Sequence, residues 1–439
     1  MEGFLEIEPA QAGGQKHISF WRNPVAWLTE KKLSRNFWVF FAAAFFFDFG
    51  FSVYFFLFNL FLLDFQFNER AIGLIGGALT LGSVVGTLPV GWLARRSGPR
   101  LLLIFCMIAA PLLGIVRTIW MLEWAQIGLA FLAGLAMCIW GVSFLPTVAR
   151  LTTEENRSSA FSLIFSVSIG TSALGGAVCG YLPQWLKMAG YPMQAVEVKR
   201  IILLASCCIA MAGLIPLLRL RVPEPESKDQ SQGEIAKQPW RLSPFLLRFL
   251  PSMALWTAVL ASFTPFANVY LSRDLGVPLH QIGMIFSAAQ VIQLCVGLLT
   301  PLVFRWLGLV DGIVATQVAT AAAMGCLAGT RHQGLAIALY LSLSATQWMS
   351  SPGLYNLLMS RVPDEERSSA AAMTMFCNAL LQSCAIAGAG ILFTRFGYPR
   401  VLVGIAALAF IAALLFRSMF APADRRKLAQ LDVEADAPS

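Results

Sequence analysis

The chain has 439 residues, of which 57% are hydrophobic and only 13% are charged, with a formal net charge of +8. A soluble domain needs about a quarter of its residues charged to cover its surface, so this composition excludes a soluble globular protein. It also argues against nucleic-acid binding, because no soluble face is available to carry a basic patch.

Twelve apolar stretches follow one another along the chain, each close to the ~20 residues that a helix needs to cross a bilayer. They predict an all-α, polytopic membrane protein with twelve transmembrane helices. The predicted helices span residues 37–62, 71–93, 101–122, 126–147, 160–182, 201–218, 246–271, 282–304, 309–329, 334–359, 369–393 and 399–417.

The distribution of basic residues predicts the orientation of these helices. An even number of crossings places both termini on one side, and that side receives most of the 32 Lys and Arg residues. The positive-inside rule makes it the cytoplasmic side. We expect no cleaved signal peptide, because the first 35 residues lack a short apolar core. The compact loops suggest a bacterial inner (plasma) membrane.

No cofactor or metal site is predicted. The nine cysteines lie in apolar segments without a CxxC pair, and the three histidines lie far apart in the sequence. A phosphate-binding GxxxxGK[ST] loop does not occur, and no paired carboxylates or nucleophile–base pair stand out. The sequence therefore predicts neither an enzyme nor an ATP-driven pump.

An internal repeat relates the two halves of the chain at an offset of 210 residues. Two six-helix halves in the same orientation are the arrangement that such a parallel repeat predicts. The matches are Ile72-Gly73 with Ile282-Gly283, Arg95 and Gly98 with Arg305 and Gly308, residues 154–160 with 364–370, and Gly180 with Gly390.

The repeat divides the chain into segments. Between the halves lies a stretch rich in Pro, Glu, Gln, Ser and Lys, which is too polar to insert and too short to fold alone. We predict a cytoplasmic N-terminal segment (1–35), an N-terminal half (36–221), a cytoplasmic linker (222–243), a C-terminal half (244–418) and a cytoplasmic tail (419–439).

This organisation, with both termini inside and a long central loop, resembles the major facilitator superfamily over about residues 37–417. That family has a signature between its second and third helices, roughly G-x-L-a-D-r-x-G-r-k. The matching stretch here carries Gly91, Arg96, Gly98 and Arg100, but Arg95 occupies the acidic position. The resemblance implies alternating access and a gating role for these five residues, in a charge network that differs from the family's.

A second pair of charged clusters lies where helices 4 and 10 give way to helices 5 and 11. The clusters contain Glu154 and Arg157 in one half, and Asp364 and Arg367 in the other. They either cap these helices or form salt bridges between the halves that close the cytoplasmic side and break as it opens. We expect a mixture of both roles.

Asp48 is the one acid near the middle of a predicted helix, in the segment FFFDFGFSVYFF. An ionisable group at bilayer depth costs at least a few kcal/mol, so such groups are functional by default. Burial favours the neutral acid and access to water favours its ionisation, so Asp48 is our candidate for proton coupling. The alternative is a structural acid paired with a neighbouring polar group.

Polar side chains are concentrated on the helices that line or flank the central path in this family. In helix 1, Asp48, Ser52, Phe55 and Asn59 are spaced 4, 3 and 4 residues apart and form one stripe. Polar groups in membrane helices alternatively hydrogen-bond to their own backbone or join helices together. The predicted substrate-binding residues are Ser52, Asn59, Asn268, Gln290, Gln293, Gln347, Ser351, Tyr355, Asn378 and Gln382.

Arg117, near the outer end of helix 3, is expected to extend its charge to the membrane interface. The helices of the predicted cavity contain no central Lys or Arg, which argues against a small anionic substrate. We therefore predict a secondary transporter for a neutral or weakly cationic organic solute, monomeric and coupled to protons through Asp48. The alternatives are an uncoupled facilitator, a transporter whose Asp48 binds a cationic solute directly, and a membrane receptor or scaffold that does not transport.

Overall fold

The computed structural model describes residues 33–188, 190, 194–220, 243–362 and 367–435. In this part of the chain every regular element is a helix, which confirms the predicted all-α class. The first 32 residues, nearly all of the predicted linker and the end of the tail lie outside the described residues.

The helices follow the predicted stretches closely. The N-terminal half contains α2 (Arg35–Asp64), α3 (Glu69–Ile119), α4 (Glu123–Arg150), α5 (Glu154–Met188), α6 (Ala195–Ala212) and α7 (Leu214–Leu218). The C-terminal half contains α9 (Pro244–Phe263), the 3₁₀ turn η1 (Thr264–Phe266), α10 (Ala267–Arg273), α11 (Leu279–Leu307), α12 (Leu309–Gly329), α13 (Gln333–Arg361) and α14 (Arg367–Ala435).

Ten helical spans in the described residues are long and apolar enough to cross a membrane. One of them, Met373–Ala421, is broken at Gly397 and is long enough for two crossings. A further helix, α13, has 29 residues and is polar along part of its length. Counting the broken span twice and adding α13 gives the predicted twelve crossings.

The backbone repeats the internal symmetry of the sequence. Gly98 and Gly308, 210 residues apart, adopt nearly the same conformation, with φ and ψ of 72° and 157° in one and 81° and 161° in the other. Glycine is the residue that tolerates this region readily, so both helix connections need it. Ser34 and Ser243 likewise cap α2 and α9 with the same φ of −63° and ψ of 151°. The chain is therefore two pseudo-symmetric halves.

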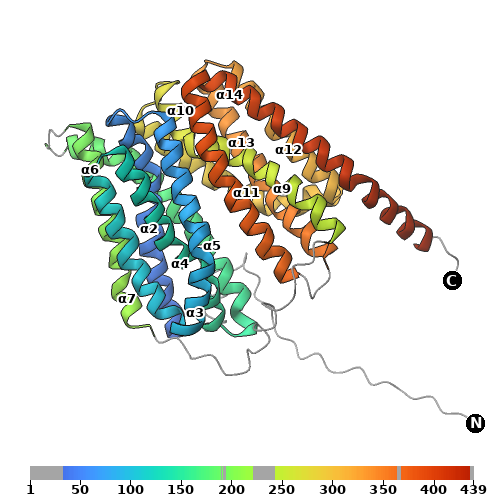
Figure 1. The fold of residues 1–439 in the computed structure, drawn as a ribbon, viewed down its shortest axis with the longest axis horizontal. Coiled ribbons are helices and arrows are strands. Elements are labelled where there is room, and N and C mark those ends of the chain that lie inside the picture. Colours follow the sequence, from blue (N-terminus) through green and yellow to red (C-terminus); the bar gives the residue numbers. More distant parts are fainter. Residues whose placement is uncertain (1–32, 189, 191–193, 221–242, 363–366, 436–439) are drawn as a thin grey trace, which may run out of the picture.

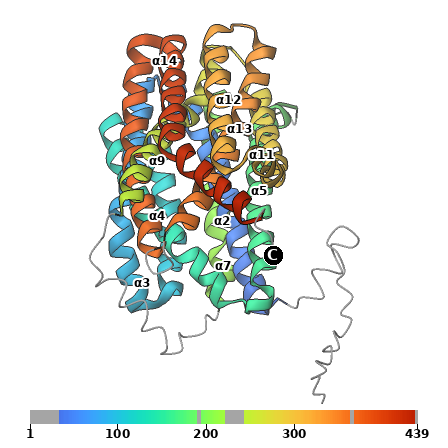
Figure 2. The same ribbon diagram turned by 90° about the vertical axis from the view of Figure 1, so that its right-hand side faces the viewer.

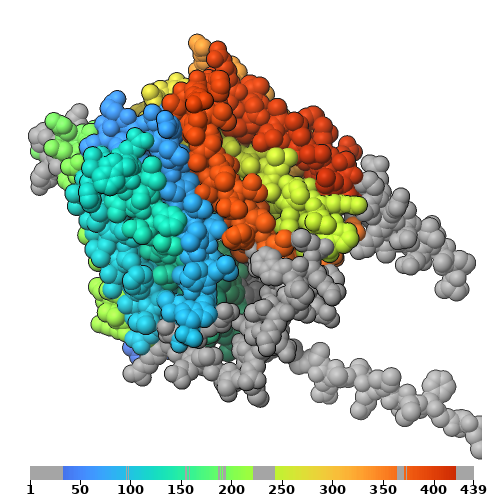
Figure 3. Space-filling model, viewed as in Figure 1, coloured from blue at the N-terminus to red at the C-terminus, as the bar shows by residue number. Residues whose placement is uncertain are grey.

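The halves pack through α3 against α14 and through α5 against α11, and α10 also contacts α2. Figure 1 shows the two bundles inclined to each other and meeting near the labels of α10 and α14, and Figure 2 shows α5 beside α11 from the side. In the space-filling view, α3 and α14 are in direct contact (Figure 3).

Close backbone approach marks the end of the molecule where the halves meet. A Cβ on Gly390 would lie 2.4 Å from the Glu69 carbonyl oxygen, and one on Gly283 would lie 2.3 Å from the Gly176 carbonyl oxygen. Only residues without a side chain permit such proximity. We call this the closed end, defined by Glu69, Gly180, Arg273 and Gly390, and the opposite end, with Gly98 and Gly308, the far end.

The faces of α3, α14, α5 and α11 that contact the opposite half at the closed end become exposed toward the far end. Leu88 lies three turns beyond Gly77 on α3 and is 72% exposed, and Phe376 lies two turns from Ser383 on α14 and is 42% exposed. On α5 and α11, Phe165 and Leu298 occupy the corresponding positions and are also exposed. The two halves therefore diverge from the closed end toward the far end.

Candidate functional site

Asp48 lies between three helices of the N-terminal half. It is half-buried on α2, and the Ser168 hydroxyl of α5 donates a hydrogen bond of 2.6 Å to its Oδ2 atom. The Trp140 side chain of α4 also faces the carboxyl group. A short O–H···O contact of this kind is typical of a charge-assisted hydrogen bond.

Aromatic packing holds Trp140 in place beside the acid. Its ring centroid lies 4.4 Å from that of Phe47 on α2, 5.1 Å from Phe144 and 6.0 Å from Phe40. Within the described residues, no Lys or Arg forms an ion pair with Asp48. Because no cation among the described residues pairs with it, the carboxyl group is placed to bind a proton or a cationic ligand.

Ser52 and the two asparagines of the predicted stripes are engaged in helix packing. The Ser52 hydroxyl donates to the carbonyls of Phe49 and Thr171, at 2.9 and 3.2 Å. Asn59 Nδ2 donates to the Pro265 carbonyl, and Asn268 Nδ2 donates to the Phe56 carbonyl, both at 2.9 Å. The asparagines form a reciprocal pair of contacts between α2 and the η1–α10 segment, so they join the halves in this conformation.

The other predicted substrate-binding residues have polar side chains without hydrogen-bond partners among the described residues. In the described part of the chain their side chains make no hydrogen bond with the protein, and Nε2 of Gln347 is buried without a partner. Unpaired polar groups in a membrane protein must face water, a solute or one another. These residues are Gln290 and Gln293 on α11, Gln347, Ser351 and Tyr355 on α13, and Asn378 and Gln382 on α14.

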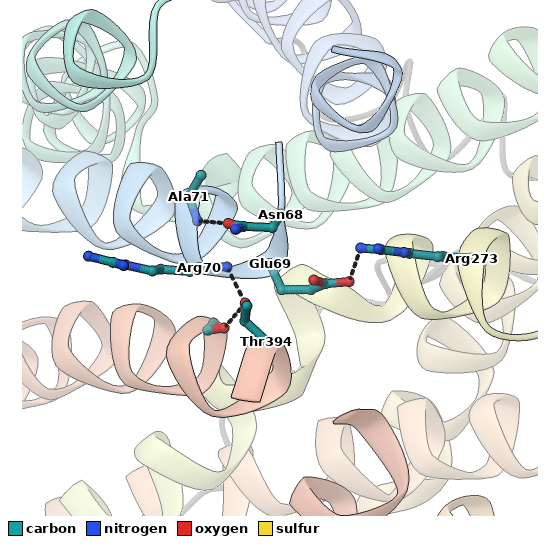
Figure 4. Close-up of polar contacts among 7 residues, drawn as sticks. Asn68, Glu69, Arg70, Ala71, Arg273 and Thr394 are labelled. Carbon is teal, nitrogen blue, oxygen red and sulfur yellow. Dashed lines mark hydrogen bonds and ion pairs between the residues drawn. The ribbon is translucent and has the colours of Figure 1, made fainter. Parts of the chain in front are cut away.

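An ion pair at the closed end was not predicted from the sequence. Arg273 Nη1 lies 2.9 Å from Glu69 Oε1, and Glu69 is only 6% exposed (Figure 4). Beside it, the Arg70 amide donates to Thr394 Oγ1 at 2.8 Å (Figure 4). The position of Glu69 could be inferred from the sequence, because it follows the N-cap Asn68 in the first turn of α3. Its pairing with Arg273, 204 residues away, could not be inferred from any local pattern.

The environment of Asp274, next to this ion pair, disfavours its charge. Desolvation is the largest effect and raises the pKa of Asp274, the negative charge of Glu69 raises it further, and Arg273 acts in the opposite direction.

Two hydroxyl groups extend the contact between the halves away from the closed end. Ser383 donates to the Gly77 carbonyl at 2.7 Å, and Ser287 donates to the Ala173 carbonyl.

The predicted gating residues that the structure describes lie at the far end. Arg96 stacks over Trp92 at 4.1 Å, and Arg100 Nη2 donates to the Leu218 carbonyl at 2.7 Å, so both act within the N-terminal half. A Cβ on Gly91 would contact no other residue, and Arg157 Nε is buried without a partner. Asp364 and the side chains of Arg95, Glu154 and Arg367 lie outside the described residues, so the network stays a prediction.

The prediction for Arg117 is wrong. Its side chain is 3% exposed and lies over the Phe58 ring at 4.4 Å, while Nε donates to Gln126 Oε1 at 3.3 Å. Gln126 in turn donates to the carbonyls of Arg117 and Trp120, which end α3. The guanidinium therefore fastens α3 and α4 to α2, because the aromatic face and the amide replace its contact with water.

Comparisons with known proteins agree with this fold. A model of the Major Facilitator Superfamily matches residues 40–386, whereas no curated protein matches the chain. The crystal structure of a point mutant of the nucleoside transporter NupG superposes with a TM-score of 0.70 at 13% identity, over 88% of this chain and 100% of that one.

Two further solved structures are similar. A D-xylose-proton symporter gives a TM-score of 0.68 at 16% identity and covers 87% of this chain and 96% of its own. A bacterial homolog of the human lysosomal transporter Spinster, in an inward-facing and occupied conformation, gives 0.69 at 12% identity, over 87% and 95%. The twelve-crossing architecture, the two pseudo-symmetric halves and the family match lead to one conclusion: the chain is a transporter, not an enzyme, and belongs to the Major Facilitator Superfamily.

Proposed function

We propose that this protein is a secondary active transporter that moves a small organic solute by alternating access and couples it to protons through Asp48. The observation that carries the proposal is the Asp48 carboxyl group, held by the Ser168 hydroxyl at 2.6 Å with no ion-pair partner in the described residues. A carboxyl group in that position responds to the presence of water more strongly than an ion-paired one.

The conformation suggests how coupling would work. By the positive-inside rule the far end faces the cytoplasm, so the halves are closed toward the outside and separated toward the inside. Asp48 lies about 16 Å below Asn59 along α2, on the same helix stripe and away from the closed junction. In this state water from the cytoplasm would favour release of its proton, and closure of the far end would favour proton retention.

The amide-bearing faces of α11, α13 and α14 support a solute rich in hydrogen-bonding groups. Carboxamides and hydroxyls both donate and accept, so they suit hydroxyl or amide groups of a neutral molecule. The similar structures include transporters described for nucleosides and D-xylose, which are solutes of this kind. We therefore propose a neutral or weakly cationic solute.

One observation favours a second candidate, in which Asp48 binds a cationic solute without moving a proton. Trp140 lies beside the carboxylate and packs against Phe47, and aromatic faces next to a negative charge attract ammonium groups. The two candidates differ in whether the solute carries the charge that neutralises Asp48. An uncoupled facilitator is the third candidate and predicts no dependence on a proton gradient.

Proteoliposomes containing a pH-sensitive dye distinguish these candidates. Nucleosides, D-xylose and organic amines are added one at a time, and proton movement and solute uptake are recorded together. Proton coupling predicts that the active solute moves protons and that Asp48→Asn abolishes both gradient-driven uptake and proton movement. Asp311→Asn, a surface acid 3.5 Å from Arg417, serves as the control and should behave as wild type.

Two results would contradict proton coupling through Asp48. Uptake of an amine without proton movement, lost in Asp48→Asn, would favour direct cation binding. Uptake that is indifferent to the Asp48 substitution would refute a coupling role for this residue.

A further inference from the structure

A cavity of about 390 Å³ lies in the C-terminal half toward the far end, on helices other than those that surround Asp48. It is formed between α11, α12 and α13. Its walls are apolar, provided chiefly by Pro301, Phe304, Leu309 and Pro352, and Arg305 and Asn356 provide its charged and amide groups. Its volume is within the range of small-molecule sites, about 300–1,000 Å³.

Two glycines make room for the Phe304 ring, which lines this cavity. A Cβ on Gly312 would lie 2.6 Å from the ring, and one on Gly353 would lie 2.7 Å from it, so a larger residue at either position would clash with the ring. The prolines contribute a second effect. Pro301 and Pro352 lack the amide hydrogen that would bind the carbonyl four residues earlier, so each removes one backbone hydrogen bond from its helix beside the cavity.

The polar side chains of the cavity include a cation and an amide but no acidic group. No Asp or Glu lines it, and in the described part of the chain neither Arg305 nor Asn356 forms a side-chain hydrogen bond or ion pair with the protein. The hydrogen of the Thr300 hydroxyl is already donated to the Val296 carbonyl within its own helix, so it is not available to a ligand. A guanidinium and an amide at one side of an apolar pocket match a carboxylate or phosphate group attached to a short hydrocarbon part.

We infer that this cavity binds an amphipathic organic anion, whose carboxylate or phosphate contacts Arg305 and Asn356 while its apolar part lies against Phe304. This ligand differs from the neutral or weakly cationic solute proposed for transport. Its lining residues are on α11, α12 and α13, whereas Asp48 lies among α2, α4 and α5, so the site is additional to the one around Asp48.

The internal repeat shows that the cavity is not a general feature of the architecture. At the offset of 210 residues, Arg95 corresponds to Arg305, but Ala94 stands in place of Phe304 and Pro146 in place of Asn356. The N-terminal half therefore has the cation without the aromatic floor or the amide. Residues that differ between the repeats are free to serve a purpose specific to one half.

The cavity lies entirely within one half of the molecule. Gln293, Gly297 and Pro301 are spaced four residues apart on α11, so the cavity continues the face of Gln293 toward the far end. All the residues that line it belong to the C-terminal half, so binding needs no contribution from the N-terminal half. The inference therefore does not rest on the proposed alternating access.

Binding to the purified full-length protein in detergent tests the inference. Hexyl phosphate and hexanoate are the probes, hexanol is the neutral control, and calorimetry gives the affinities. We expect the anions to bind about tenfold or more tightly than hexanol, and Arg305→Gln to remove that preference, since a charge-assisted contact is lost. Asn356→Leu should weaken anion binding with the fold intact, whereas Arg331→Gln, an exposed arginine of the same half, should not.

Two further arms identify the source of the ligand and separate this inference from the proposed function. In lipid nanodiscs, displacement of hexyl phosphate by phosphatidylglycerol would identify a lipid headgroup, and its persistence would identify a soluble anion. Asp48→Asn should bind hexyl phosphate normally, so loss of coupling and loss of the anion site are independent results. Equal affinity for hexanol and hexyl phosphate, or unchanged anion binding in Arg305→Gln, would overturn the inference.

Discussion

Asp48 and Ser168 form the most consequential pair at the scale of single residues. The carboxyl group accepts a 2.6 Å hydrogen bond from a hydroxyl that belongs to another helix, and Trp140 lies beside it. Hydrogen bonds to an ionised group contribute about 1.5–3 kcal/mol when buried and less when half-exposed. Ser168 is thus placed to tune how readily Asp48 exchanges its proton.

Ser168→Ala should shift the pH dependence of transport without abolishing it. The carboxylate loses a donor, so the midpoint of the pH profile should move to higher pH, by about one unit at most. Ser172→Ala is the matched control, because the Ser172 hydroxyl donates to the Ser168 carbonyl within its own helix. Equal profiles for the two variants would show that the Asp48–Ser168 contact has no role in proton exchange.

Sequence reasoning at this scale identified the acid but not its surroundings. Asp48 was conspicuous because it is alone in an apolar segment, whereas its bond to Ser168 depends on how α2 packs against α5. Asn59 and Asn268 are predicted from the sequence to bind substrate, whereas their reciprocal contacts connect distant parts of the chain and cannot be read from local sequence. Arg117 was misjudged because an aromatic ring and an amide, both remote in sequence, bury it.

The junctions between helices determine which end of the molecule is closed. At Gly390 and Gly283 the helices of opposite halves approach so closely that a Cβ would overlap a carbonyl oxygen. These junctions rely on close packing and a few hydrogen bonds rather than on a large apolar core. They are therefore suited to elements that separate during a transport cycle.

Gly390→Val should prevent closure of this end and shift the protein toward the opposite conformation. The added side chain would meet the Glu69 carbonyl, and overpacking of this kind typically costs about 1–3 kcal/mol. Gly388→Val on the same helix is the control, because a Cβ there contacts nothing. Spin labels at Gln66 and Arg331 report the distance across the closed end, which should lengthen in Gly390→Val alone.

Asp274→Asn should stabilise the protein at neutral pH. The pKa of Asp274 is raised in the folded state, so the folded protein binds the proton more tightly than the unfolded chain does. Stability is therefore fully present below the usual carboxyl pKa and falls as the pH rises through the raised value. The asparagine variant, which never ionises, avoids that loss.

Thermal unfolding measured across pH checks this expectation. The difference between Asp274→Asn and wild type should be greatest near neutral pH and disappear below about pH 4. Asp311→Asn, whose weak surface ion pair spans 3.5 Å, should show no such gain. A difference that persists at low pH would mean that the substitution acts through something other than the carboxyl charge.

At the scale of the whole molecule, the fold was largely predictable. The lengths of the apolar segments and the 210-residue repeat can be read directly from the sequence, and they predict the number of helices and the two halves. The similar backbone conformations of Gly98 and Gly308 reflect the same repeat. The conformational state was not predictable, because the same sequence must form both open and closed junctions. The Glu69–Arg273 ion pair joins the two halves in this state, so the sequence alone does not predict it.

The central claim is that protonation of Asp48 is linked to the exchange of the open and closed ends. Two label pairs measure it on a background without native cysteines: Gln66 with Arg331 across the closed end, and Thr153 with Ser360 across the far end. Electron–electron distances are recorded in nanodiscs over a range of pH. We predict that raising the pH shortens the first distance and lengthens the second, and that Asp48→Asn removes both responses. Unchanged pH responses in Asp48→Asn would contradict the account.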